Sequence, residues 1–477
     1  MANKKVSELT ALTSSDGTEE LIVNDGGISK KITQADLLDC HHPTSTSSLG
    51  VGRLTLDNNT GTSNTAVGYT ALRYNTTGER NTALGYRTLL NNTTGYRNSC
   101  VGHDSMFTNT TGYYNTAIGY QTLYFNTTGK YNVAVGMQSL FNNTTASANT
   151  AVGYAALFTN TTGNNNSALG YAALKDNTTG VSNTALGYNA LLYNTTGIYN
   201  NATGYKALFY NTTGSKNTAD GLQSLYNNTT GYENVANGYR ALYDNTSGRY
   251  NAAVGSDSLY NNTTGISNNA FGRQALNYNT TGSYNNAFGY QALFDNSTGE
   301  RNNAFGYSAL GNNTTGLNNT ALGYSALSTT TTGQNNTGLG YNADASSAAT
   351  NNEITLGNSS VATLRCNVTT ITSLSDERDK DNIQDLDAGL EFINNLRPVR
   401  FDWNMRDGGK VGVNDTGFIA QELQSAQQTT GVQIPNLVMD ENPDKLEAGY
   451  GTLVPVLVQA VKELTARVQQ LEKQLQG

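Results

Sequence analysis

Residues 64–97 read NTAVGYTALRYNTTGERNTALGYRTLLNNTTGYR, which is one 17-residue pattern written twice. The glycine at position 68 returns every 17 residues as far as Gly340, giving 17 copies, and a degenerate copy precedes them at Gly52. A period of this length, sustained over so many copies, is typical of a solenoid or a stacked array. We therefore predict a mainly β, solenoid-like shaft over residues 52–343.

The columns of the repeat suggest how one coil is built. Alanine follows two residues after the opening asparagine in 15 of the 17 copies, and Cys100 and Gly338 are the exceptions. Val67 and most of its equivalents are large and apolar, so small and large residues alternate as they do in a strand. We expect strand, turn, short strand and turn in each coil. The Val67 column would form a narrow core, and the alanine and glycine columns would face the backbones of other chains.

Asparagine and glycine mark the turns. The opening asparagine is present in all 17 copies, from Asn64 to Asn336, and most copies close on NTTG. Asparagine tolerates left-handed geometry and glycine supplies a positive φ without strain, so NTTG predicts a turn rather than a glycosylation site. We also expect the asparagine columns to form hydrogen-bonded ladders along the stack.

A few residues interrupt the columns or stand near possible ligands. Cys100 and His103 occupy the alanine and tyrosine columns, which indicates variation within a repeat rather than a metal site. A second cluster, Cys40 with His41 and His42, has no further ligand nearby, so we predict a linker and no metal or cofactor. Three consecutive coils place Thr203, Asp220 and Asn237 in the otherwise apolar Val67 column, where they could enclose water or an ion.

Composition excludes several classes of protein. Charged residues are only 13% and hydrophobic residues 37%, whereas glycine (50 residues) and tyrosine (29 residues) are abundant. The net charge of −8 argues against a nucleic-acid partner, which would need basic surfaces. The start, MANKKVSELTALTSS, lacks the apolar run of a signal peptide, and no stretch is long enough to span a membrane. We therefore expect synthesis in the host cytoplasm.

The NTAVGY strand and its variants resemble the head repeats of trimeric bacterial adhesins of the YadA type. The resemblance covers residues 52 to about 343, although the period is longer than in that family. It implies a left-handed parallel β-roll assembled as a trimer. The resemblance, rather than the sequence pattern, is the source of that handedness.

The flanking regions differ from the shaft. Residues 1–40 contain EELIVND and ISKKITQADLL around DGG, which predict two short strands and a closing helix. This module resembles the N-terminal segments of phage fibres that dock on the virion. Residues 41–51 are read as a linker. Residues 344–374 are rich in β-branched residues and predict an extended β stalk.

From Ser375 the composition changes sharply, with charges, prolines and the single tryptophan. The motifs are SDERDKDNI at 375–383, LRPVRFDW at 396–403, TGFIAQEL at 416–423 and LVPVLVQAVKEL near the end. Their order and spacing resemble the C-terminal intramolecular chaperone of phage endosialidases, tail spikes and neck appendages. The resemblance implies an α+β domain at 375–477 that folds a trimer and then cleaves the chain.

In that family the cut falls just before the serine of S-D-x-R-x-K, which here places it between Leu374 and Ser375. Lys380, five residues after the serine, would act as the base. A serine hydroxyl needs a neighbouring base to become a nucleophile, and a Ser–Lys pair is one known solution. A lysine base must be neutral, which burial or a neighbouring cation favours. Asp376, Arg378 and Glu422 are the supporting residues. Taken alone, SDERDKD also suits a helix cap followed by a solvated turn.

The last residues predict a coiled coil at 454–475. Apolar residues step by three and four along this tail, from Val454 through Leu464 to Leu475. Pro455 sits in the first helical turn, where its missing N–H costs little. Valine and leucine in this arrangement lean toward dimers in isolated coiled coils. We nevertheless predict a homotrimer, because both resemblances imply threefold symmetry.

Together these patterns predict a structural tail-fibre or appendage protein of a virion. Its N-terminus would bind the baseplate or tail, and the fibre would contact a host cell-surface glycan or protein. The only enzyme activity expected is the self-cleaving serine peptidase. A polysaccharide depolymerase tail spike is the alternative, but 52–343 offers no non-repetitive region for a glycosidase site. A trimeric bacterial surface adhesin would need a signal peptide and a membrane anchor.

Overall fold

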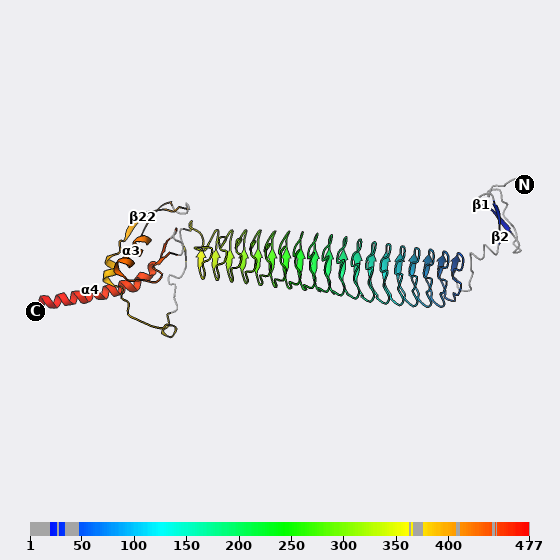
Figure 1. Cartoon of the computed structure of the whole chain (residues 1–477), viewed down its shortest axis with the longest axis horizontal. Coiled ribbons are helices and arrows are strands. Elements are labelled where there is room, and N and C mark those ends of the chain that lie inside the picture. The colour runs from blue at the N-terminus through cyan, green and yellow to red at the C-terminus, as the bar shows by residue number, and fades with distance from the viewer. Residues whose placement is uncertain are drawn as a thin grey trace. The chain divides into compact units, whose positions relative to one another are not determined.

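The predicted solenoid is confirmed by the computed structural model of the chain. Within the described residues, nineteen parallel strands of three residues each follow one another as successive coils (Figure 1). The described residues are 20–25, 28–33, 47–361, 364–365, 375–406, 411–440, 444 and 446–476. The chain divides into two compact units, 1–300 and 301–477.

The first unit contains a short hairpin and fifteen of these solenoid strands. Its strands are β1 (Glu20–Asp25), β2 (Ile28–Thr33), β3 (Leu49–Val51), β4 (Thr65–Val67), β5 (Thr82–Leu84), β6 (Ser99–Val101), β7 (Thr116–Ile118), β8 (Val133–Val135), β9 (Thr150–Val152), β10 (Ser167–Leu169), β11 (Thr184–Leu186), β12 (Asn201–Thr203), β13 (Thr218–Asp220), β14 (Val235–Asn237), β15 (Ala252–Val254), β16 (Asn269–Phe271) and β17 (Asn286–Phe288).

The hairpin matches the two strands expected near the N-terminus. β1 and β2 pair antiparallel, with Glu20 opposite Thr33 and Asp25 opposite Ile28. The helix expected after them lies outside the described residues, as do Cys40, His41 and His42.

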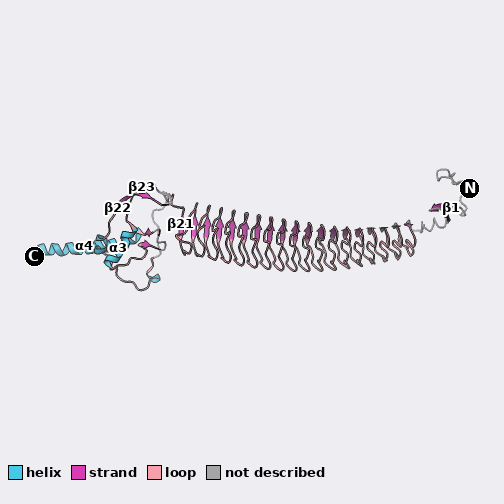
Figure 2. Ribbon diagram, turned by 45° about the horizontal axis from the view of Figure 1, so that its top comes forward, coloured by secondary structure: helices cyan, strands magenta, loops and turns pink. Residues whose placement is uncertain are grey.

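Each coil carries one strand rather than two, so the expected second short strand is wrong for the described coils. In the first coils, Thr70 and Leu72 have φ values of +52° and +50°, and the equivalent residues of later coils repeat this conformation. Two left-handed residues so close together bend the backbone into a turn and prevent an extended strand. Figure 2 shows the strands along one side of the coils and loops along the rest.

The core of the coil is the reverse of the expected one. Ala66 and Leu72 are fully buried, and so are nearly all of their equivalents in the other coils, whereas Val67 is 37% exposed. The Val67 column therefore does not form the core, and the alanine column does not face other chains. The reason is space: the Leu72 column already fills the narrow interior, so the strand can turn only its small residue inward.

The expected asparagine ladders are present and buried. The backbone N–H of Asn81 donates to the Asn64 side-chain oxygen at 2.9 Å, and the Asn92 amide donates to the Asn75 side-chain oxygen at 2.6 Å. Both side-chain amides also donate to the carbonyl oxygen of Gly95, each at 2.9 Å. The turn asparagines are thus structural, because each replaces hydrogen bonds that a buried turn would otherwise lose.

Glycine permits close stacking of consecutive coils of the same chain. Gly68 has a φ of +134°, and a methyl group on it would lie 2.3 Å from the carbonyl oxygen of Gly85. Gly78, in the NTTG turn, does not have a positive φ, contrary to expectation; a methyl group there would lie 2.2 Å from the carbonyl oxygen of Gly95. Ala146 stands in the same column, so that approach is tight but adjustable.

The second unit begins with four further solenoid strands. These are β18 (Asn303–Phe305), β19 (Thr320–Leu322), β20 (Thr337–Leu339) and β21 (Ile354–Leu356). β21 pairs with β20 in parallel, so a coil follows the end of the clear repeat, in a region expected to be a separate stalk. Glu353 takes the place of the opening asparagine there, and its backbone N–H donates to Asn336 at 3.0 Å.

The rest of the second unit is α+β, as expected, and ends in a long helix. Its elements are η2 (Glu377–Asp379), α2 (Leu390–Asn394), β22 (Val399–Asn404), β23 (Val411–Gly417), α3 (Ala420–Thr430), β24 (Val438–Met439), β25 (Glu447–Ala448), η3 (Tyr450–Thr452) and α4 (Leu453–Gln476). A small core surrounds Phe392 and includes Leu423, Leu437, Leu453 and Val456. β22 and β23 form an antiparallel pair.

The helix α4 carries the predicted apolar seam unpartnered in the single chain. Val454, Leu464 and Leu471 are 58%, 50% and 56% exposed, whereas Val456 belongs to the small core and Ala460 is also buried. One side of α4 thus holds the domain together and another is open for partner helices. The pairing of three such helices remains a prediction.

Candidate self-cleavage site

A single turn brings Ser375 and Lys380 together. The side chain of Asp376 accepts a hydrogen bond from the backbone N–H of Arg378 at 2.9 Å and so caps η2 (Glu377–Asp379). The backbone N–H of Lys380 then donates to the carbonyl oxygen of Glu377 at 3.1 Å, which closes the turn. The acidic cap suits the start of a helical turn, where backbone N–H groups are unpaired.

The two predicted catalytic groups are in direct contact. Lys380 Nζ donates to Ser375 Oγ at 2.6 Å and to the Ser375 carbonyl oxygen at 3.3 Å. A nucleophile and its base need a separation of about 2.6–3.2 Å for proton transfer, and this pair lies within it. The turn therefore brings together the serine and the lysine that the sequence motif separates by four residues.

Asp376, which caps the turn, forms an ion pair with Arg378 of the same turn. The Arg378 guanidinium donates to both carboxylate oxygens of Asp376, with its Nε at 3.0 Å from Oδ1. This hydrogen bond holds the pKa of Asp376 below its ordinary value. Asp376 and Arg378 thus stabilise the turn. The Arg378 guanidinium pairs with the Asp376 carboxylate rather than lying against Lys380.

The remaining predicted residues are not brought to the pair. Glu422, on α3, accepts a hydrogen bond from Arg397 Nε at 3.1 Å, and this contact raises the pKa of Arg397. The structure therefore places Glu422 in an ion pair that joins α3 to the segment between α2 and β22. Leu374, on the other side of the expected cut, lies outside the described residues.

Ser375 and Lys380 differ from a working serine–lysine active site in their exposure to solvent. Ser375 and Lys380 are both exposed to solvent in the single chain, and so is every described residue from 375 to 387. A lysine can accept a proton only in its neutral form, which burial favours over the ammonium. The single chain thus supplies the pairing of nucleophile and base without the dry surroundings that activate such a base.

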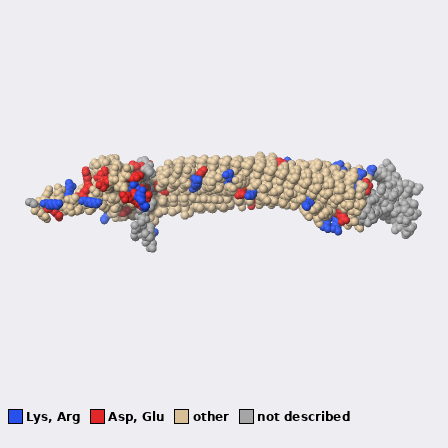
Figure 3. Space-filling view, turned by 90° about the horizontal axis from the view of Figure 1, so that it is seen from below, with Lys and Arg blue, Asp and Glu red and all other residues tan. Residues whose placement is uncertain are grey.

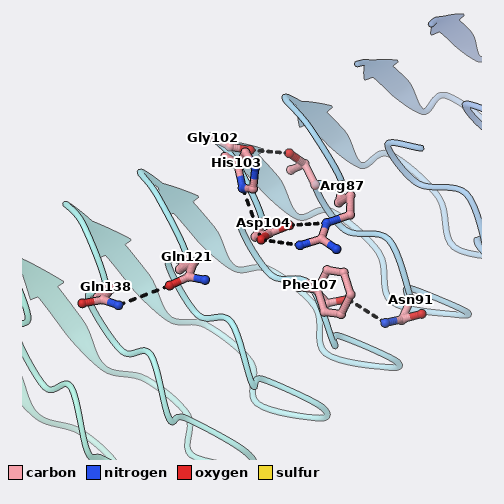
Figure 4. Close-up of polar contacts among 9 residues, drawn as sticks. Arg87, Asn91, Gly102, His103, Asp104, Phe107, Gln121 and Gln138 are labelled. Atoms are coloured by element: carbon pink, nitrogen blue, oxygen red, sulfur yellow. Dashed lines mark hydrogen bonds and ion pairs between the residues drawn. The ribbon is translucent and has the colours of Figure 1, made fainter. Parts of the chain in front are cut away.

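The cysteine and histidine within the repeat have structural roles. Cys100 is buried and its thiol lies 3.2 Å from Met106 Sδ; burial raises its pKa well above the ordinary value. His103 stacks on Tyr86 and lies beside Asp104, which accepts two hydrogen bonds from Arg87 at 2.7 Å (Figure 4). Among the described residues, no group of three histidine, cysteine or acidic residues could hold a metal ion.

The shaft also has a groove that the sequence did not single out. In the first unit, a cavity of about 1060 Å³ runs over threonines of the NTTG turns, including Thr195 and Thr212, and its sides include Tyr193, Tyr210 and Tyr278. The signal in the sequence is the column that begins at Tyr74, which mixes aromatic residues with asparagine, aspartate and threonine.

Comparison with known proteins identifies the C-terminal region. Residues 375–439 match the family model described as the chaperone of endosialidase, and the match begins at Ser375. No curated protein and no solved structure matches the chain. Within the described residues, no helix is long and apolar enough to cross a membrane. A β-solenoid together with a segment similar to the chaperone of endosialidase is consistent with a tail-spike or fibre-type protein.

Proposed function

We propose that this chain is a virion tail-fibre or appendage protein that recognises a host surface and matures by cutting itself between Leu374 and Ser375. The contact of Lys380 Nζ with Ser375 Oγ, at the start of the chaperone match, is the observation that carries the cleavage. The solenoid supplies the fibre, and the chaperone family supports a homotrimer.

The cleavage would proceed through an ester. Lys380, as the neutral amine, removes the Ser375 hydroxyl proton while Oγ attacks the carbonyl carbon of Leu374. The bond from that carbon to the Ser375 nitrogen breaks, and the nitrogen takes a proton to become a free amine. Water then hydrolyses the ester, leaving a carboxylate on Leu374 and restoring the Ser375 hydroxyl. Because the groups are neighbours in one chain, the attack gains from proximity.

Assembly would activate the site. Ser375 and Lys380 are exposed in the single chain. Partner chains that cover this turn would exclude water and favour the neutral lysine. Cleavage would then follow trimer formation rather than precede it, so the chaperone would leave only after its work is done.

Intact mass of the purified protein tests the cleavage. Wild type should give fragments ending at Leu374 and beginning at Ser375, whereas Ser375→Ala and Lys380→Ala should leave the full-length chain. Lys380→Arg should also fail, because a guanidinium stays protonated at neutral pH. Ser425→Ala and Lys462→Ala, exposed residues of the same region, are matched controls that should cleave normally. An uncut wild-type trimer would contradict the proposal.

Host recognition has a candidate place in the tyrosine-lined groove. Aromatic rings beside amide and carboxylate groups, such as Asn227 and Asp244, suit the apolar faces and hydroxyls of a sugar. Tyr193→Ala with Tyr210→Ala should lower binding of labelled fibre to host cells at least tenfold. Tyr250→Ala, an exposed tyrosine in another column, should leave binding unchanged. Equal binding by all variants would place recognition elsewhere.

A further inference from the structure

In the first unit, the outward side of the solenoid strands carries a column of mostly large apolar residues beside a column of mostly small polar ones. We call this side the strand face and define it as the first and third residues of β4 to β17, for example Thr184 and Leu186 of β11. Its large members are exposed: Ile118 is 42%, Leu169 50% and Leu186 43% exposed. Neighbouring strands pair in parallel, so these residues form straight columns, and Phe271 stacks on Phe288 at 4.9 Å.

Charge is almost excluded from the strand face. From Thr65 to Phe288, Asp220 is its one charged residue. The charged residues of the coils gather in other columns, as with Arg87, Asp244 and Arg249. Figure 3 shows one face of the molecule, where Lys, Arg, Asp and Glu are scattered over a mostly uncharged surface. Depletion of charge marks the buried centre of protein interfaces, and monomers rarely expose apolar patches above a few hundred Å².

We propose that the strand face is the surface through which the shafts of three copies of this chain pack, parallel and in register. The inference rests on the proposed trimeric fibre and names the contact within it. A second copy is the occupant that matches, because it carries the same columns at the same spacing along the same length. The chaperone segment lies at the same end of every chain, which makes the copies parallel.

The competing surface is the tyrosine-lined groove, and its chemistry argues against it. Asp176 and Asp244 both line it, so an interface of identical chains there would bring like carboxylates together at two levels. On the strand face charge is confined to one level, Asp220, and in the Val67 column the polar residues are confined to three consecutive coils, Thr203, Asp220 and Asn237. The groove would therefore remain on the outside of the trimer.

Hydroxyl-radical footprinting of the wild-type fibre tests the proposal without substitution. Phe271 and Phe288 lie on the strand face and are 38% and 36% exposed in the single chain; Phe125, in the column that lines the groove, is 41% exposed. Three copies packed through the strand face should reduce oxidation of Phe271 and Phe288 at least fivefold relative to Phe125. Equal oxidation of all three rings in a trimer would overturn the proposal.

Charge substitution gives a second, independent readout. Leu169→Glu with Leu186→Glu should convert the trimer to monomer, or lower its dissociation temperature by more than 10 °C. Tyr193→Glu with Tyr210→Glu, at similarly exposed positions of the groove, should leave the trimer intact. Mass by light scattering, with circular dichroism to confirm the folded coils, separates loss of assembly from loss of folding.

Different results would contradict the trimeric fibre and the strand-face interface. A wild-type protein that scatters as a monomer would remove the trimeric fibre and the interface together. A trimer in which the groove pair dissociates the chains, or in which Phe125 is the protected ring, would keep the fibre and overturn the strand face alone.

Discussion

The shaft and the C-terminal region are stabilised by different kinds of buried core, one repeated in each coil and one unique. Almost every coil of the shaft repeats the same buried residues, an alanine, a leucine and two asparagines such as Asn64 and Asn75. The C-terminal region has one small core around Phe392 that nothing else in the chain repeats. Repetition gives many equal contacts with no unique alignment between chains, whereas a unique core gives one alignment with few contacts.

This difference explains why a fibre would carry a chaperone that it later discards. Sliding one shaft by 17 residues against another preserves nearly every contact, so misaligned trimers compete with the correct one. A C-terminal region without repeats can fix the alignment at one end, after which the coils pair in order along the stack. Once the shaft has formed, slow unfolding maintains it.

Deleting residues 375–477 should have the largest effect. The shaft expressed as 1–374 should be insoluble or misaligned, because non-local pairing of three chains is slow when nothing sets their alignment. The measurement is the yield of soluble, heat-resistant trimer by light scattering. The control is wild type after its own cleavage, which removes the same residues from a folded fibre. A normal trimer from residues 1–374 would show that the chaperone is dispensable.

Paired core truncations sharpen the comparison. Phe392→Ala in the C-terminal core and Leu191→Ala in the shaft each cost about 2–5 kcal/mol locally, since both side chains are fully buried. The consequences should differ: Phe392→Ala should lower the yield of trimer severalfold, whereas Leu191→Ala should leave yield near normal and lower the unfolding temperature of the shaft. Equal losses of yield would mean that both regions set the alignment.

The asparagine ladder should show a smaller, local effect. Asn143 donates to Asn126 at 2.7 Å and to the Ala146 carbonyl at 3.0 Å, and it accepts from Asn160 at 3.1 Å. Asn143→Ala should cost about 1–3 kcal/mol for each polar group left unpaired, measured by denaturant unfolding of the fibre. Its neighbour Asn142 is only half-buried, so Asn142→Ala should cost well under 1 kcal/mol. Similar costs for the two would argue against a stabilising ladder.

The sequence could predict the features of the fold that follow directly from its repeat pattern. The period predicted the stacked coils, and the invariant Asn64 column predicted the ladders. The inward side of the strand could not be read, because alanine and valine are both apolar and the usual rule buries the larger one. Only the packed coil shows that the Leu72 column leaves room for alanine alone. The Ser375 and Lys380 pair came from resemblance, while the partner of Glu422 depended on how α3 packs.

The smallest expected effect is at Asp220, the charged residue of the strand face, which is exposed in the single chain. If three shafts pack through this face, its carboxylate loses water, and replacing such a buried charge with an apolar residue is often neutral or stabilising. Asp220→Leu should therefore raise the unfolding temperature of the trimer by about 2–4 °C, the shift expected for roughly 1 kcal/mol. Asp244→Leu, in the groove, should change it by less than 1 °C. A drop with Asp220→Leu would mean instead that the carboxylate has a specific partner in the trimer. The same three polar residues would also mark the alignment, because a slip of two coils sets Asp220 of one chain level with Leu186 or Val254 of another. Polar residues at one level of the shaft would then lower the stability of the trimer slightly but fix the alignment of its three chains, which the repeated coils alone do not fix.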